Sequence, residues 1–243
     1  MEPGKVESAL RRWGFSPVGM VAVLLVFVGF FLAVTVHEVF FALLAMGAFG
    51  PGLLRQFGVI RDLDECQKRA SVEAAHRAFL AAGLFLTAVI IARNWGRLDL
   101  GHDLVPAHLV LALLLVVYAV SYCLSFWDPR QAAFLVLLSF GIFWLVFTVL
   151  SHGNEPVVVL IEGGTVAVPL ILAAFLARRW PRIIGLLLVA ASIAAVVHYH
   201  LIPTMGLTPE RVFGKIGLII LLPLPLALMG LALLGRRASA EGQ

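Results

Sequence analysis

One carboxylate lies inside an otherwise apolar run, and it is the residue of this chain best suited to chemistry. Glu162 follows the segment 157–161, which is wholly apolar, and it precedes Gly163 and Gly164. If this run crosses a membrane, the carboxylate lies about 10 Å below the interface, at 1.5 Å per residue. An ionisable side chain there costs about 2.5–3.5 kcal/mol on insertion scales and is normally paired, neutralised or in contact with water. Glu162 is therefore the first candidate for an ion- or proton-binding group.

Histidines supply the partners that such a carboxylate would use. The sequence contains seven, and all except His76 fall near the same ends of the apolar runs described below: His37, His102, His108, His152, His198 and His200. His108 and His198 lie four to five residues inside their runs, so their depths match that of Glu162 within about one helical turn. This match predicts a constellation of Glu162, His108 and His198.

Three chemistries would use that constellation. A carboxylate with neutral imidazoles suits zinc, copper or iron, and the candidate metal ligands are His37, Glu38, His108, Glu162, His198 and His200. A chain of His and Glu suits proton relay in a coupled transporter. Two histidines on facing helices could ligate a b-type haem. The identity of a cofactor stays open, and the ordinary alternative is that each histidine hydrogen-bonds a backbone carbonyl or a lipid headgroup.

The composition indicates what positions these residues. The chain of 243 residues is 61% hydrophobic and 13% charged, whereas soluble domains are about 45–50% apolar and 25% charged. A soluble protein of this size has too little interior to cover so much apolar surface. The basic residues occur in short clusters between apolar runs, which is typical of loops at an anionic leaflet and not of a nucleic-acid-binding face. We therefore expect an all-α polytopic membrane bundle, a single integral membrane domain over 1–243, in a bacterial inner membrane.

Seven apolar stretches are long enough to cross a bilayer, since a span needs about 20 residues. They cover 17–54, 74–92, 104–126, 131–151, 156–178, 182–202 and 212–235. The first would extend about 55 Å as one helix, too long for a single crossing. We expect it to form a hairpin at His37 and Glu38, giving eight spans, or seven if residues 17–50 form one long helix.

The distribution of basic residues favours eight spans. With both termini cytoplasmic, 14 of the 18 Lys and Arg residues fall inside and 4 outside, whereas the best seven-span arrangement gives 11 against 7. The positive-inside rule prefers the larger asymmetry.

Residues 62–77 are predicted to form a cytoplasmic helix extension that leads into the span at 74–92. Asp62 is the expected N-cap, with Glu65 three residues later, as in a capping box. Acid-first pairs at spacing i,i+4 follow, among them Asp64 with Lys68 and Glu65 with Arg69. Those four residues are the candidates for docking a membrane or cytoplasmic protein, although a merely solvated helix has the same pattern.

Several functions fit these features. The leading hypothesis is a proton- or ion-coupled transporter or channel-like carrier of a small solute. The alternatives are a membrane-embedded metal-dependent enzyme acting on a lipid or isoprenoid, a b-type haem subunit, and a membrane scaffold or assembly factor. Pro169, Pro223 and Pro225 lie within spans and predict broken helices, which transporters often place around their sites. The sequence contains no Walker A, GxGxxG or GxSxG motif, so nucleotide-driven and serine-hydrolase chemistry have no support.

Overall fold

The computed structural model describes residues 17–60, 62–94, 106–152, 155–198 and 209–235. All regular structure in these ranges is helical, with no strand. The chain divides into two compact units, residues 1–69 and 70–243. The helix α4 (Glu65–Asn94) begins in the first unit and continues in the second.

Six helical segments are long and apolar enough to cross a membrane. They are Glu65–Ile91, Leu109–Phe126, Pro129–Leu150, Pro156–Arg179, Pro181–His198 and Arg211–Leu234. Each overlaps one of the six apolar stretches after the first, so the expectation of an all-helical chain with several apolar helices of membrane-spanning length is confirmed. The periodicity of these segments carries little information, because both sides of such a helix are apolar. Length and hydropathy alone identify them.

The first apolar stretch is divided into two helices at His37 and Glu38. Helix α2 (Pro17–Thr35) and helix α3 (Phe41–Gln56) are joined by a short 3-10 turn, η1 (Glu38–Phe40). A Cβ built on Gly29 would meet the backbone of Leu43 and Leu44, and one on Gly47 would meet Ala22, so the helices are antiparallel. The single long helix is therefore excluded. With 19 and 16 residues, α2 and α3 extend about 28 and 24 Å, and the count of eight spans stays a prediction.

The hairpin forms without glycine or proline because His37 supplies the turn chemistry. Its Nδ1 atom accepts a hydrogen bond from the backbone N–H of Val39, at 3.1 Å. The carbonyl of His37 accepts from the N–H of Phe40, also at 3.1 Å. These two bonds satisfy backbone groups that the end of one helix and the start of the next leave unpaired.

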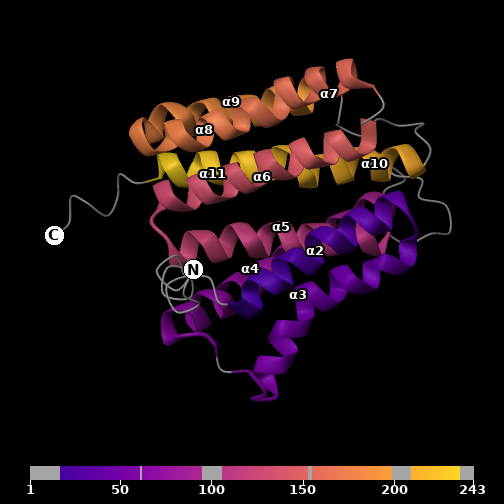
Figure 1. Ribbon diagram of the computed structural model, residues 1–243, viewed down its shortest axis with the longest axis vertical. Helices are drawn as coiled ribbons and strands as arrows, with labels where there is room; N and C mark the ends of the chain where they lie inside the picture. Colours follow the sequence, from indigo (N-terminus) through magenta and orange to yellow (C-terminus); the bar gives the residue numbers. More distant parts are fainter. Residues whose placement is uncertain (1–16, 61, 95–105, 153–154, 199–208, 236–243) are drawn as a thin grey trace, which may run out of the picture. The chain divides into compact units, whose positions relative to one another are not determined.

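The remaining helices of the second unit alternate in direction along the chain and pack on one another. They are α5 (Ala107–Phe126), α6 (Pro129–His152), α7 (Pro156–Glu162), η2 (Gly163–Ala167), α8 (Val168–Arg179), α9 (Pro181–His198), α10 (Pro209–Leu221) and α11 (Pro223–Leu234). Helix α6 packs on α8, α9 on α11, and α5 on α10, and Figure 1 shows α8 and α9 beside α6 and α11. The central core includes Leu137, Ala174 and Met229, each at most 1% exposed.

Both spans with internal prolines depart from regular α-helix, one by a π-helical turn within a continuous helix and the other by an interruption. The turn η2, which ends two residues before Pro169, is a π-helical turn in which the N–H of Val168 donates to the carbonyl of Gly163. Pro169 has no N–H and its ring would clash with the carbonyl of Thr165 four residues earlier, so a wider turn relieves the strain. The last span is interrupted at Leu222, which lies between the end of α10 at Leu221 and the start of α11 at Pro223.

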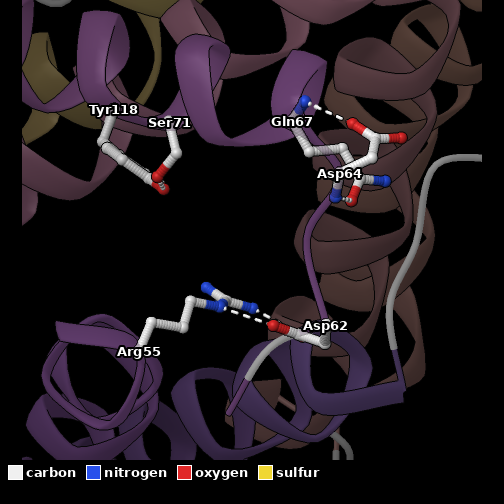
Figure 2. Close-up of polar contacts among 6 residues, drawn as sticks. All are labelled: Arg55, Asp62, Asp64, Gln67, Ser71 and Tyr118. Atoms are coloured by element: carbon white, nitrogen blue, oxygen red, sulfur yellow. Dashed lines mark hydrogen bonds and ion pairs between the residues drawn. The ribbon is translucent and has the colours of Figure 1, made fainter. Parts of the chain in front are cut away.

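The N-terminus of α4 differs from the prediction by two residues. Asp64, and not Asp62, is the N-cap: its Oδ1 accepts from the N–H of Gln67 at 2.7 Å, and Gln67 Oε1 accepts from the N–H of Asp64 at 3.3 Å. This is a capping box with glutamine at N3. Asp62 instead accepts two hydrogen bonds from the Arg55 guanidinium, both at 2.8 Å (Figure 2). A bidentate arginine pair of this kind fixes geometry as well as charge.

Candidate functional site

Glu162 has a histidine as its partner, but not one of the two predicted. The nearest nitrogen is His152 Nδ1 on α6, at 3.5 Å from Glu162 Oε2. The side chains of Glu162 and His152 are 43% and 38% exposed, so the pair lies at the rim of the helix packing and not within the core. The separation is within ion-pair distance, but the geometry does not make a hydrogen bond, since His152 Nδ1 is buried without a hydrogen-bond partner among the described residues.

The residues of the pair are brought together by the short connection between α6 and α7. Helix α6 ends at His152 and α7 begins at Pro156, so two consecutive helices must turn back on each other at this point. A Cβ on Gly163 would lie 3.3 Å from Leu145, and one on Gly141 would lie 3.2 Å from the carbonyl of Ala167. These contacts give an antiparallel register in which Gly163 is level with Leu145 and Gly141 with Ala167. Glu162 and His152 are therefore about one turn apart along the two helices, and their side chains bridge this offset.

A line of polar atoms continues from His152 along α6. Thr148 and Trp144 precede it at intervals of four residues, which places all three on one face of the helix. Thr148 Oγ1 and Trp144 Nε1, like His152 Nδ1, are buried without a hydrogen-bond partner among the described residues. Thr148 is 0% exposed. We call Trp144, Thr148 and His152 the α6 polar face.

The orientation of Thr148 is unusual for a threonine in a helix of this protein. Thr87 donates to the carbonyl of Gly83 at 2.8 Å, and Thr165 donates to that of Ile161 at 2.7 Å. Each satisfies its hydroxyl on the residue four positions earlier, which is the usual solution within a helix. Thr148 makes no such bond in the described structure. A buried hydroxyl without a hydrogen-bond partner costs about 1–3 kcal/mol, so the missing bond of Thr148 needs a physical explanation.

The two histidines predicted to join Glu162 lie on other helices. His198 is the last residue of α9, and its side chain is exposed. His108 lies in the first turn of α5, but its side chain is outside the described part, as is the whole of His200. Helix α9 packs on α8 and α11, and α5 packs on α6, α10 and α11. The antiparallel packing puts His108 and His198 at the same end of the second unit as Glu162, and their convergence with it stays a prediction.

The proposed metal ligands are only partly described. Among the described side chains, no three His, Cys, Asp or Glu residues come close enough to hold a metal ion. His37 uses Nδ1 in the hairpin turn, while the side chain of Glu38, like those of His108 and His200, falls outside the description. The metal and haem hypotheses therefore stay untested.

The candidate docking residues lie on the first turn of α4. Glu65 and Lys68 form an exposed pair at 3.6 Å, with side chains 91% and 66% exposed, and Arg69 is exposed as well. Asp64 is occupied as the N-cap. Further along, Ser71 hydrogen-bonds Tyr118 of α5 at 2.9 Å (Figure 2). The docking hypothesis stays a prediction for the exposed residues of this turn.

The sequence contained a signal for the residues that were missed. His152 ends α6 and Glu162 follows ten residues later at the end of α7, so the short connection alone brings the two side chains within reach, without any assumption about distant helices. The spacing of Trp144, Thr148 and His152 is also visible in the sequence as i, i+4, i+8. Equal depth in distant spans predicts contacts less well, because residues at the same depth need not lie on neighbouring helices.

Comparison with known proteins adds no relative. No protein-family model matches the chain, no curated protein matches it, and no solved structure resembles it closely enough to be a match. The functional argument therefore depends on the geometry of the Glu162–His152 pair and of the α6 polar face.

Proposed function

We propose that the protein is a proton- or ion-coupled transporter, or channel-like carrier, of a small solute in a bacterial inner membrane. The observation that carries the proposal is the contact of 3.5 Å between Glu162 and His152 within apolar helices. Intramembrane carboxylates are expensive, and those that face a polar partner commonly mark ion pathways and proton relays. Glu162 binds the proton or cation, and His152 accepts or returns the proton.

The helices around the pair suit a carrier. The π-helical turn of η2 begins one residue after Glu162, and π-turns within helices often occur at functional sites. The backbone hydrogen bonds of a π-helical turn span five residues, whereas those of the adjoining α-helix span four. Such a turn can therefore change its register more readily than a regular helix. In this proposal, η2 lets the carboxylate reorient when its charge changes, and His108 and His198 contribute to the same end of the site.

The test is ion movement in liposomes that contain the purified full-length chain. A potassium diffusion potential is imposed, and proton or sodium entry is followed with dyes inside the vesicles. We expect vesicles with the wild-type chain to admit the ion faster than empty vesicles, and Glu162→Gln to lose this flux because an amide cannot ionise. His152→Gln should slow proton entry, since glutamine keeps polarity but does not take up a proton near neutral pH.

Glu155→Gln is the matched control. Glu155 is exposed, precedes the first turn of α7 and makes no side-chain capping bond, so its loss should leave the flux unchanged. The proposal is wrong if the wild-type chain admits neither ion faster than empty vesicles, or if Glu162→Gln retains the wild-type rate.

A further inference from the structure

We propose that Arg130 and Arg178 hold the phosphate of one anionic phospholipid, whose acyl chains lie along the exposed apolar side of α8. The two arginines lie at the end of α6 opposite to His152. The occupant is a membrane lipid and not a soluble phosphate compound. The inference goes beyond the proposed function and is independent of it, because neither arginine belongs to the Glu162–His152 pair.

The register of α6 on α8 brings the two arginines to the same level. A Cβ on Gly141 of α6 would lie 3.2 Å from the carbonyl oxygen of Ala167 and 3.2 Å from the backbone nitrogen of Ile171. Because the two helices are antiparallel, the start of α6 is then level with the last turn of α8. Arg130 is the second residue of α6 and Arg178 is the last but one of α8, so they lie within about one turn of each other along the helices.

Small residues let the two helices approach closely at this end. Ala133 of α6 and Ala174 and Ala177 of α8 are each at most 1% exposed and belong to the central core. Small side chains at a helix crossing allow the backbones to come near each other. Their sequence neighbours Phe134 and Arg178 are therefore brought into contact across the two helices.

The guanidinium of Arg178 is held in a fixed orientation by an aromatic ring. Its Cζ atom lies 3.6 Å from the centroid of the Phe134 ring, and Phe134 is itself buried. Stacking of this kind uses the face of the guanidinium and leaves its five N–H donors, which lie in the plane, available. Within the described ranges no hydrogen bond or ion pair engages these donors. A planar fork of free donors suits two oxygens of one phosphate.

The two positive charges are not neutralised by a carboxylate in the part of the chain that the structure describes. Asp128, the acid nearest to Arg130 in sequence, accepts a hydrogen bond from the backbone N–H of Arg130 at 3.2 Å. Neither guanidinium forms an ion pair with a described residue. Like charges within a turn of each other repel, and an anion bound between them would relieve this repulsion. In the predicted topology this end faces the cytoplasm, where the leaflet contains anionic lipids.

The surface next to the arginines favours a lipid over a soluble phosphate compound. Val168, Leu172 and Phe175 of α8 are 47%, 56% and 55% exposed, and their spacing places them on one side of the helix. The Phe175 ring packs against the edge of Phe134 at 5.4 Å between centroids, so the apolar side continues directly into the ring beneath Arg178. From position 168 to position 178 this surface extends about 15 Å, half of the hydrocarbon thickness of about 30 Å. It therefore matches one phospholipid in length as well as in chemistry.

The experiment is native mass spectrometry of the full-length chain, purified in a neutral detergent and titrated with dioleoyl phosphatidylglycerol or dioleoyl phosphatidylcholine. The two lipids share their acyl chains and differ in net charge. We expect the first phosphatidylglycerol to bind about tenfold more tightly than the first phosphatidylcholine, the factor given by one hydrogen bond to a charged group. Arg130→Gln and Arg178→Gln should each remove most of this preference. Arg178→Lys should also reduce it, because lysine keeps the charge but has no planar fork of donors.

Arg182→Gln is the matched control, since it removes one exposed arginine from the start of α9, at the same end of the second unit. This variant should keep the preference for phosphatidylglycerol. Equal losses in Arg182→Gln and Arg178→Gln would indicate diffuse attraction to the whole basic surface and would overturn the inference. A wild-type chain that binds the two lipids equally would overturn it as well.

A soluble probe separates a lipid from a free phosphate compound. Glycerol 3-phosphate, added at the same concentration as phosphatidylglycerol, should not displace the lipid, because it makes no contact with the apolar side of α8. Displacement would assign the site to a soluble phosphate compound and would contradict the proposal. Glu162→Gln should bind phosphatidylglycerol as the wild type does, so the test of lipid binding and the test of ion flux can fail separately.

Discussion

The packing of α9 on α11 allows one prediction in depth, because two glycines make the contact. Gly230 of α11 lies against Gly185 and Val189 of α9. Ser192 of α9 donates to the carbonyl of Pro223 at 2.9 Å, which ties the same two helices together. Small residues at such crossings let backbones approach closely. Gly230→Ala places a methyl group at the centre of this contact.

The magnitude follows from the distances. A Cβ at position 230 would lie 2.7 Å from Val189 Cγ2, 2.8 Å from the carbonyl oxygen of Gly185 and 3.1 Å from the backbone nitrogen of Val189. Favourable contacts are about 3.5–4.0 Å, and two of these three atoms are backbone, so the helices must separate. Overpacking of this kind costs about 1–3 kcal/mol. Alanine regains about 0.8–1.0 kcal/mol of helix propensity, so we expect a net loss of up to about 2 kcal/mol.

The assay is reversible unfolding in mixed micelles, with the free energy of unfolding taken from tryptophan fluorescence. Gly83→Ala is the matched control, since a Cβ at this position of α4 has no atom within 4 Å. The same substitution should there raise the free energy of unfolding by up to about 1 kcal/mol. Equal effects at the two positions, or a more stable Gly230→Ala, would refute the assignment of Gly230 to a close helix contact.

Two further predictions concern the first unit and the start of α4. If the hairpin crosses the membrane twice, position 37 lies outside the cell and position 66 lies inside. A membrane-impermeant maleimide added to intact cells should then label His37→Cys in a Cys66→Ala background, and it should not label the native Cys66. Labelling of both positions from one side would contradict eight spans. Asp64→Ala removes the acceptor for the N–H of Gln67 and should lower the stability of the first turn of α4 by about 0.5–2 kcal/mol. We expect the backbone amide of Gln67 to exchange faster with solvent in Asp64→Ala than in the wild type, and at close to the wild-type rate in Asp64→Asn. An unchanged exchange rate in Asp64→Ala would show that the cap contributes little.

Most of the helical architecture could be predicted from the sequence, because a membrane span is identified by length and hydropathy without any knowledge of its neighbours. Six stretches were assigned in this way, and the prolines marked where two of them break. The N-cap of α4 could not be assigned in the same way. Asp62 and Asp64 both satisfy the local rules, and the choice depends on Arg55, seven residues before Asp62, which takes that carboxylate for a bidentate pair.

The candidate site was predicted in part. Glu162 could be recognised because an ionisable residue in an apolar run is costly wherever the run packs. Its partner could not be chosen by depth, since several histidines occupy the same end of the second unit and only packing decides which one is adjacent. Thr148 was missed because a threonine in a transmembrane helix ordinarily bonds its own backbone, and only the side-chain orientation shows that this one does not.

The sequence by itself determined that the chain is a bundle of apolar helices carrying one carboxylate at depth and histidines near the ends of its spans. Those properties depend on the free energy of transfer of each segment from water to lipid, and this free energy is a sum over the segment's own residues. Tertiary structure alone decided that Glu162 meets His152 and that three polar atoms align, unpaired, along one face of α6. Such properties depend on register and rotamers, which are set by close approaches such as that of Gly163 to Leu145 and have no counterpart in composition.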